Sequence, residues 1–228
     1  MVRLYLFAEG QTEQTFADNL IKPHLAQYQV YLNHLILIAH SRKKGAVHRG
    51  GGRNYAPMKN DILRFLKQEK SSDVCFTTMI DLYAIHPDFP GLAESEAVRQ
   101  DPFERVKFLE QRFAEDIGDR RFIPYIQLHE YEAYLLSDPT CFEYLSAENT
   151  KGIEMLQTIA SQYSTPELIN DGSQTAPSKR IIAQFPDYGK AKSTFGPQLA
   201  EKIGLQAIRN TCPHFNQWLS KLEGLGGK

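Results

Sequence analysis

Short apolar runs alternate with longer segments of helical period over the first 130 residues of the chain. Four of the apolar runs have the length of a β-strand: Val2 to Ala8, Val30 to Ala39, Val74 to Ile80 and Phe122 to Leu128. Between them, the segments Gln11 to Gln27, Pro57 to Lys70 and Pro102 to Ile117 carry apolar residues at helical spacing. This alternation predicts an α/β fold with a mainly parallel sheet of about four strands, flanked by helices on both faces.

The pattern changes after Glu130, where the later apolar segments all have helical spacing. These segments are Tyr131 to Leu136, Ile153 to Ile159, Ser178 to Phe185 and Phe215 to Leu222. We therefore expect an α/β domain over residues 1–138 and a helical C-terminal region over residues 139–228 that packs on it. Only Asp138-Pro139 marks this boundary, so a single domain is the alternative.

The composition is that of an ordinary globular protein, with 42% hydrophobic and 23% charged residues. Because no apolar run approaches the roughly 18 residues of a membrane helix, we expect no membrane partner. An acid stands too early in the chain for a signal peptide, so the cytoplasm is the expected compartment. The net charge of −1 argues against a protein coated in positive charge for indiscriminate nucleic-acid binding.

The three cysteines suggest neither a disulfide framework nor a cysteine-rich metal site. Cys75, Cys141 and Cys212 lie far apart in the chain, and their number is odd. Any metal ion should therefore be held by oxygen ligands.

Acidic residues stand at the ends of three predicted strands. Glu9 follows the first strand, Asp81 the third and Glu130 the fourth. The carboxyl ends of parallel strands lie along one edge of a sheet, where ligands bind, so we expect these acids to converge. Glu13, in the first turn of the following helix, and Glu132, just beyond Glu130, would join them.

Converging carboxylates repel one another, so a cluster that stays ionised near neutral pH needs a cation. Oxygen ligands favour Mg²⁺, Mn²⁺ or Ca²⁺ over zinc, and the pattern predicts a site for one or two Mg²⁺ or Mn²⁺ ions. Each acid also has an ordinary explanation. Glu13 suits a first helical turn, Asp81 suits a turn, and Glu130 and Glu132 suit the surface of an amphipathic helix.

The stretches EGQTE, MIDLY and HEYEAYL, in this order, resemble the DUF4276 family of bacterial proteins. That family is grouped with the Toprim-like domains of topoisomerases, primases and the overcoming-lysogenisation-defect (OLD) nucleases. The resemblance extends from Leu4 to about Arg180 and includes the GRNY and APSKR stretches. It implies a Toprim-like sheet and phosphodiester chemistry that depends on a divalent metal.

The resemblance also implies roles for the acids. Glu9 takes the place of the glutamate after the first Toprim strand, and Asp81 that of the later acid. Glu13, Glu130 and Glu132 match the further acids of OLD-type nucleases. In Asp81-Leu82-Tyr83, Tyr83 stands where the commoner Toprim pattern has a second aspartate, a departure from topoisomerases and primases.

Members of this family are often encoded beside ATPases in mobile or anti-phage gene sets, which implies an ATPase partner and a role in phage defence. The chain contains no GxxxxGK[ST] motif, so another polypeptide would supply ATP hydrolysis. The sequence leaves the oligomeric state open, a homo-oligomer included.

Two basic stretches are candidates for binding nucleic-acid phosphates. The glycine-rich loop over residues 40–55 follows the second strand and carries Arg42, Lys43, Lys44, Arg49 and Arg53. Ser178, Lys179 and Arg180 begin a helix, whose amino end attracts phosphate. The alternatives are a solvated loop and an ordinary helix start with basic surface residues.

These residues together predict a metal-dependent phosphodiesterase or nuclease that acts on nucleic acid. Glu9, Asp81 and Lys179 are the candidate catalytic residues, with Lys179 stabilising charge on the scissile phosphate. Tyr83 and His129 are expected in a layer behind the metal ligands rather than as catalysts. The alternatives are a non-catalytic binding or regulatory subunit of an ATPase complex and a small-molecule phosphoesterase.

Overall fold

A computed structural model describes residues 1–43, 46–49, 54–169, 172 and 174–227 of the chain. A parallel sheet with the strand order β2-β1-β5-β6 lies at its centre, and β7 pairs with β5 beyond β6. The strands are β1 (Val2–Ala8), β2 (Val30–Leu37), β5 (Val74–Asp81), β6 (Phe122–Ile123) and β7 (Ile126–Gln127). The predicted α/β fold is confirmed, with five strands in the sheet instead of about four.

The extra strand arises because the predicted strand from Phe122 to Leu128 is interrupted. Pro124 lies between β6 and β7, and proline has no backbone N–H to give to a strand ladder. Thr78 of β5 holds this interruption in place, because its Oγ1 donates to Tyr125 O (3.0 Å) and accepts from Tyr125 N (2.9 Å).

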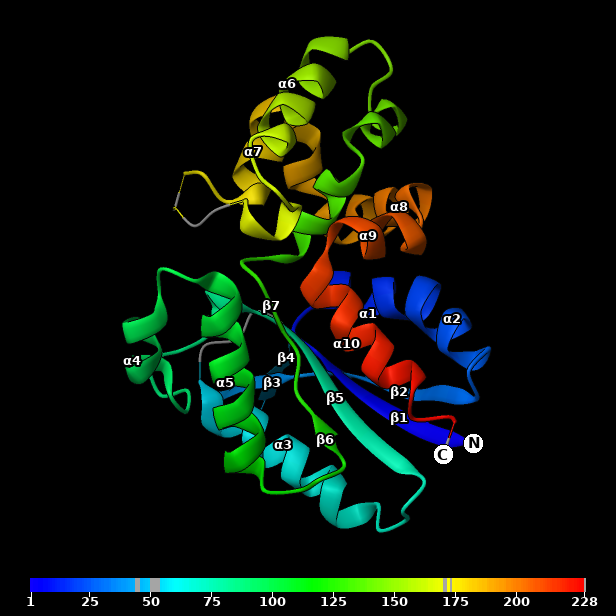
Figure 1. Ribbon diagram of the computed structural model, residues 1–228, viewed down its shortest axis with the longest axis vertical. Helices are drawn as coiled ribbons and strands as arrows, with labels where there is room; N and C mark the ends of the chain where they lie inside the picture. The colour runs from blue at the N-terminus through cyan, green and yellow to red at the C-terminus, as the bar shows by residue number, and fades with distance from the viewer. Residues whose placement is uncertain (44–45, 50–53, 170–171, 173, 228) are drawn as a thin grey trace.

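Helices cover both faces of the sheet (Figure 1). On one face α1 (Gln11–Phe16), a π-helical turn (Ala17–Ile21) and α2 (Lys22–Ala26) follow one another and pack on the core that contains Leu4 and Leu6 of β1. On the other face α3 (Tyr55–Gln68) and α5 (Pro102–Ile117) pack on the core that contains Tyr5 and Phe7. The alternation of side chains along β1 thus supplies both cores.

The connections from β1 and β5, which are adjacent strands, leave on opposite faces of the sheet. After β1 the chain enters α1 on one face, and after β5 it passes through α4 (Leu92–Ser95) to α5 on the other. In an open sheet, this arrangement leaves a crevice at the carboxyl ends of the two strands, where ligands bind. Glu9 and Asp81 stand at these two strand ends.

The C-terminal region is helical, as predicted. Its α-helices are α6 (Thr150–Ser161), α7 (Pro177–Gln184), α8 (Lys192–Ile203), α9 (Leu205–Thr211) and α10 (Pro213–Glu223). The chain also contains short 3-10 helices: Leu82–Ala84, Glu96–Val98, Tyr131–Ser137, Pro139–Tyr144, Pro166–Leu168 and Pro186–Lys190. No helix in the described part of the chain has the length and apolar content needed to cross a membrane.

Residues before and after position 138 share one core. The ring of Phe215 in α10 lies 6.0 Å from that of Phe16 in α1 and 4.8 Å from that of Tyr134, centroid to centroid. The indole N–H of Trp218 in α10 donates to Thr77 Oγ1 in β5 at 2.9 Å. The helical region therefore packs directly on the sheet and on its first helix.

The basic stretch after β2, predicted as a loop over residues 40–55, contains two strands. Residues Ala39–Lys43 (β3) and Ala46–Arg49 (β4) form an antiparallel hairpin, so the prediction of a loop is wrong for these segments. Cross-strand hydrogen bonds give the strand conformation to a sequence of low strand propensity. The hairpin starts at the acidic edge, because Ile38 N donates to Ala8 O at 3.0 Å. Lys44 and Arg53 lie outside the described residues.

The shared core predicts that the protein unfolds as one unit. Phe215→Ala should lower the free energy of unfolding by about 3–5 kcal/mol, because it removes buried ring contacts from both parts of the chain. Met155→Ala, at an exposed position of α6, should change it by less than about 0.5 kcal/mol. In urea, circular dichroism and Trp218 fluorescence should give coincident transitions. Two separate transitions would contradict the shared core.

Candidate functional site

Glu9 and Asp81 meet at the carboxyl ends of β1 and β5. The two strands are parallel, with Ala8 opposite Met79, and Glu9 N donates to Met79 O at 3.0 Å. The side chain of Glu9 then turns across the strand ends, and its Oε2 accepts a hydrogen bond from Asp81 N at 2.8 Å. The structure thus brings together the two acids that the sequence predicted as principal metal ligands.

Glu13 reaches back over the turn between β1 and α1. Its Oε2 accepts from Gly10 N at 2.9 Å, which is the capping arrangement of a helix start. Glu13 therefore has the role in the first helical turn that we considered as an alternative to metal binding. Yet Glu13 is buried, which a capping role on the protein surface does not require.

Glu130 and Glu132 are held by residues of the C-terminal helices. The carboxylate of Glu130 accepts from the backbone N–H of Ser178, and its Oε2 accepts from Ser178 Oγ at 3.1 Å. Glu132 Oε1 lies 2.9 Å from Lys192 Nζ and accepts from the Tyr188 hydroxyl at 3.2 Å. Only 6% of Glu132 is exposed, so it is not a surface acid of an amphipathic helix.

These five residues, Glu9, Glu13, Asp81, Glu130 and Glu132, form what we call the acidic cluster. Burial and then the charge of Glu13 raise the pKa of Glu9 to about 8, against the hydrogen bond from Asp81 N, which lowers it. Burial also raises the pKa of Glu13 to about 7, with a contribution from Glu132. The pKa of Asp81 lies well above its usual value because of burial and then the charges of the four glutamates. The five acids therefore act on one another electrostatically.

The pKa of Glu130 is raised as well, first by burial and then by Glu132, while the hydrogen bonds from Ser178 lower it. The positive charge of Lys192 lowers the pKa values of Glu13 and Glu130. Lys192 thus favours the ionised forms of Glu13 and Glu130, in addition to its direct ion pair with Glu132.

Asp81 provides the test of whether a cation fits the cluster. Its Oδ1 is buried and has no hydrogen-bond partner among the described residues. An orphaned carboxylate oxygen beside further carboxylates suits a hard divalent ion, and the donors present, all oxygen, suit Mg²⁺ or Mn²⁺. The donor chemistry of the acidic cluster therefore fits such an ion.

The other four carboxylates of the acidic cluster are held by hydrogen bonds within the protein. No group of three or more His, Cys, Asp or Glu side chains within the described residues is arranged to hold a metal ion. Glu9, Glu13, Glu130 and Glu132 each accept from a donor of the protein itself. An ion bound at the cluster would therefore replace some of these donors.

Tyr83 and His129 flank the cluster in the chain and lie against each other. Tyr83 N donates to His129 O at 3.3 Å, and the two rings are 5.9 Å apart. His129 has a φ of 63°, a left-handed conformation that costs energy in a residue with a Cβ. The chain turns sharply here, between β7 and the helix that carries Glu132.

Both residues line a pocket of about 300 Å³ that also receives Arg99 and Arg105. Glu96 pairs with both guanidinium groups, at 3.0 Å from Arg99 and 2.5 Å from Arg105. The pocket lies next to the acidic cluster because Tyr83 follows Asp81 by two residues. We did not predict the two arginines from sequence, because neither Arg99, in the turn before α5, nor Arg105, in the second turn of α5, belongs to a motif.

The predicted phosphate-binding residues that the structure describes lie in two places, at the start of α7 and in the hairpin of β3 and β4. Ser178 begins α7 and directs its donors to Glu130, while Lys179 is exposed beside it. Arg180 Nε donates to Thr175 O at 2.7 Å, and the guanidinium also donates to the Tyr163 hydroxyl. The strands of the hairpin carry the remaining described members, which are Arg42, Lys43 and Arg49.

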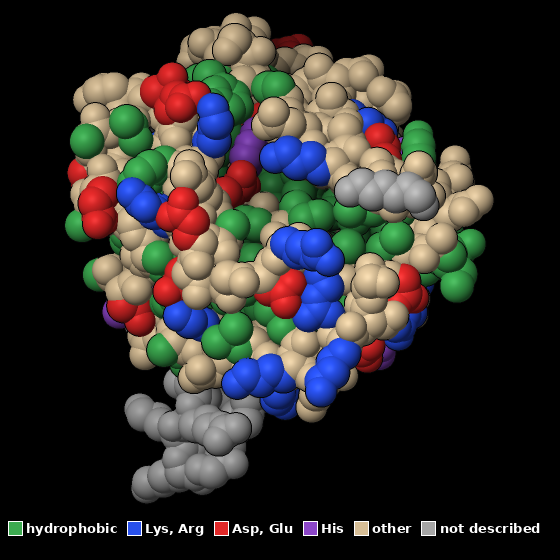
Figure 2. Space-filling model, turned by 60° about the horizontal axis from the view of Figure 1, so that its bottom comes forward, with side chains coloured by type: hydrophobic (Ala, Val, Ile, Leu, Met, Phe, Trp, Pro, Cys, Tyr) green, Lys and Arg blue, Asp and Glu red, His purple; other side chains and the backbone are tan. Residues whose placement is uncertain are grey.

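One face of the protein away from the acidic cluster carries charges of both signs. In Figure 2, basic and acidic side chains lie side by side around a shallow hollow on the face that turns forward from the lower side of Figure 1. Pairs such as Arg121 with Asp119, 2.8 Å apart, are of this mixed kind. Such a face is a poor binding surface for a polyanion, because its acids offset its bases.

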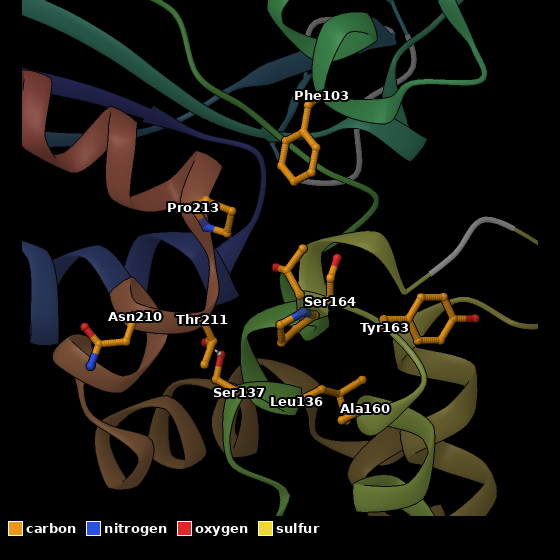
Figure 3. Close-up of a pocket in the computed structure, with 11 residues that line it drawn as sticks. Phe103, Leu136, Ser137, Ala160, Tyr163, Ser164, Asn210, Thr211 and Pro213 are labelled. Carbon is orange, nitrogen blue, oxygen red and sulfur yellow. Dashed lines mark hydrogen bonds between the residues drawn. The ribbon is translucent and has the colours of Figure 1, made fainter.

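A larger pocket, of about 530 Å³, lies between the start of α5 and the C-terminal helices (Figure 3). Ser137 and Thr211 approach each other on its wall, with Thr211 Oγ1 donating to Ser137 Oγ at 2.8 Å. Its lining, as far as the described residues give it, contains neither a charged side chain nor a member of the acidic cluster. The acidic cluster at the carboxyl ends of β1 and β5 therefore remains the candidate site.

Residues 8–223 match the model of the family described as Domain of unknown function (DUF4276). The chain belongs to the DUF4276 family. The predicted membership is confirmed, whereas the relation of this DUF4276 protein to Toprim and OLD nuclease domains stays a prediction. No curated protein and no solved structure matches the chain.

The raised pKa values predict how the stability of the metal-free protein depends on pH. Glu9 and Glu13 titrate near 8 and 7 in the folded state, above their usual 4.5, so folding retains protons that unfolding releases. Their stabilising contribution is fully present below pH 4.5 and is lost as the pH rises through 7 and 8. In EDTA, the melting temperature should therefore fall between pH 5 and pH 8.

The Glu9→Gln variant isolates the contribution of Glu9, because the side chain of glutamine does not ionise between pH 5 and pH 8. Its melting temperature should change less with pH than that of the wild type. Glu115→Gln, at an exposed position of α5, should keep the wild-type dependence. A Glu9→Gln variant with the full wild-type slope would show that Glu9 titrates normally.

Proposed function

We propose that this DUF4276 protein is a metal-dependent phosphodiesterase that cleaves nucleic acid. The observation that carries the proposal is the convergence of Glu9 and Asp81, across the ends of adjacent parallel strands, with three further glutamates. Such a group of buried carboxylates is stable in its ionised form only with a cation. The crevice at these strand ends is also where open α/β sheets bind their ligands.

Glu9, Glu13 and Asp81 would hold one or two Mg²⁺ or Mn²⁺ ions, with Glu130 and Glu132 as further ligands. When bound, the ions supply positive charge to the phosphate oxygens and to the attacking water. The protein contributes the positions of the acids, which the backbone N–H groups of Asp81, Gly10 and Ser178 hold in place.

Lys179 is the candidate for neutralising charge on the scissile phosphate. It is exposed at the start of α7, directly after Ser178, which holds Glu130. The phosphate group would therefore lie between a basic side chain and the acidic cluster. The ammonium group acts as a point charge and requires no fixed hydrogen-bond geometry.

The pocket beside Asp81 is the proposed site for the neighbouring part of the substrate. Arg99 and Arg105 offer guanidinium groups to phosphate oxygens, and Tyr83 offers an exposed ring on which a base can stack. The hairpin with Arg42, Lys43 and Arg49, which leaves the sheet at the same edge, would extend the contact surface. Contacts of this kind position a backbone and read little sequence.

The cellular role rests on the family resemblance alone. On that ground we propose that the protein acts in the bacterial cytoplasm, in a phage-defence system with an ATPase partner. The partner would supply ATP hydrolysis, and homo-oligomers are compatible with the proposal.

The internal hydrogen bonds of the carboxylates favour a second candidate, a non-catalytic subunit of an ATPase complex. In that case the donors to Glu13, Glu130 and Glu132 serve only the fold. The size of the pocket beside Asp81 favours a third, a phosphoesterase that acts on a mononucleotide-sized ester.

The first test is cleavage of plasmid, single-stranded DNA and RNA by purified protein in Mg²⁺ or Mn²⁺. Asp81→Asn should lower the rate by more than about a hundredfold, beyond the loss typical of a residue that only supports a metal ligand. Asp73→Asn is the matched control. Asp73 stands at the other end of β5 and pairs with Arg3 at 3.2 Å, so this variant should retain activity.

Several outcomes distinguish the candidates. Cleavage that persists in both Asp81→Asn and Glu9→Gln would indicate a contaminant or a different site. Saturable Mn²⁺ uptake in calorimetry without cleavage would indicate a nuclease that needs its partner. A wild-type protein without such uptake favours the non-catalytic subunit. Phosphate release from small esters with intact polynucleotide would identify the phosphoesterase.

A further variant tests the substrate pocket. Arg99→Gln should raise the KM for an oligonucleotide and leave kcat unchanged, because it removes one phosphate contact distant from the reacting bond. The slope of log affinity against log salt concentration should fall by about one. Arg112→Gln, which removes an exposed arginine of α5 paired with Glu115, should change neither quantity. Equal effects of the two variants would argue against the pocket.

A further inference from the structure

The side chain of Gln127, the last residue of β7, is buried without partners. Only 1% of the residue is exposed, and neither Oε1 nor Nε2 has a hydrogen-bond partner within the described residues. Buried side-chain amides nearly always have partners, because leaving them unpaired destabilises the folded state. A leucine or methionine would fill the same volume without this cost. The amide therefore needs a functional explanation.

The register of the sheet places Gln127 beside Asp81. Strands β5 and β7 pair in parallel, with Ile80 opposite Ile126 and Asp81 opposite Gln127. Opposed residues of neighbouring strands, whose backbones run about 4.8 Å apart, direct their side chains to the same face of a sheet. Gln127 thus extends to the same side as the carboxylate of Asp81.

The two cores identify that face. Ile80 and Ile126 both belong to the core beneath α3 and α5, so the residues that follow them point to the opposite face. That face carries α1 and the C-terminal helices, and it includes Met79 and Tyr125 at the neighbouring odd positions. The acidic cluster lies at its edge, where α1 begins with Glu13.

Two orphaned polar groups thus lie side by side. Asp81 Oδ1 and both polar atoms of Gln127 are buried without partners among the described residues. The amide can donate to a carboxylate oxygen through Nε2 and can accept from a hydrated cation through Oε1. With one divalent ion held by Asp81, Oδ1 would contact the ion, Oε1 would accept from a water on the ion, and Nε2 would donate to the Asp81 carboxylate.

We propose that Gln127 is a positioning residue of the acidic cluster, which orients Asp81 through Nε2 and faces the hydrated Mg²⁺ or Mn²⁺ ion with Oε1. This inference rests on the proposed metal site, and it adds a neutral oxygen donor to a set otherwise composed of acids. A neutral donor provides a contact to the ion without further like-charge repulsion. It also explains why a costly buried amide stands next to the cluster.

The experiment measures two quantities that a purely structural residue would change together. Gln127→Leu should leave the melting temperature in EDTA unchanged or higher, because it removes the unpaired amide. In calorimetry, the same variant should bind Mn²⁺ at least about tenfold more weakly. A loss of this size is typical when a residue that orients a metal ligand is removed. Gln127→Met serves the same purpose if the branched side chain prevents folding.

Two further variants act as controls. Gln127→Glu keeps an oxygen toward the ion, so it should retain Mn²⁺ affinity while lowering the melting temperature in EDTA by burying another acid. Thr78→Val removes a buried hydroxyl of β5 that is fully paired with Tyr125, so it should lower the melting temperature and leave Mn²⁺ affinity unchanged.

The outcomes separate this inference from the proposed function. Wild-type Mn²⁺ binding that is unchanged in Gln127→Leu would overturn the role of Gln127 alone. A Gln127→Leu variant with lower stability and lower affinity would show a structural residue and would also overturn it. Absence of Mn²⁺ binding by the wild type would overturn the metal site and, with it, this inference. An unchanged or higher melting temperature of Gln127→Leu, together with weaker Mn²⁺ binding, supports both the metal site and the role of Gln127.

Discussion

The structure depends on one contact, the hydrogen bond from the backbone N–H of Asp81 to the carboxylate of Glu9. It forms because β1 and β5 are adjacent and parallel, so that both strands end at the same edge. Burying a carboxylate is unfavourable unless hydrogen-bond donors compensate for the lost water. Here Glu9, Glu13 and Glu130 each accept from a backbone N–H group, which the fold holds in place, and the Ser178 hydroxyl adds a second donor to Glu130.

Both parts of the chain build the site. Glu9, Glu13 and Asp81 come from the sheet and its first helix, whereas the partners of Glu130 and Glu132 come from α7 and α8. The helical region therefore does more than cover a face of the sheet. Because α8 packs on α1, with Gly196 against Thr12 and Tyr131, its position is fixed relative to the helix that follows β1. The electrostatics of the crevice are thus a property of the whole chain.

Periodicity and strand-end logic were sufficient to predict much of the fold. The strand Val2–Ala8 and the helix Pro102–Ile117 have the predicted limits, because a buried strand and a capped amphipathic helix leave strong local patterns. The meeting of Glu9 with Asp81 follows from parallel strand order alone. The hairpin escaped prediction because its strands depend on each other and not on their own propensity. Sequence reasoning did not identify Lys192, Gln127 or the pocket arginines as site residues, because only the tertiary structure brings them close to the acids.

Internal hydrogen bonds would make cation binding at the proposed metal site a competition. An ion that takes Glu130 must replace the two donors of Ser178, and one that takes Glu132 must replace Lys192 and the Tyr188 hydroxyl. The free energy of binding would then be the difference between the interactions that the ion gains and those that the acids lose. Any partner or substrate that withdraws α7 or α8 from the acids would raise that affinity by the same free energy. The donors that keep the free protein folded would thus set the conditions under which its site is loaded.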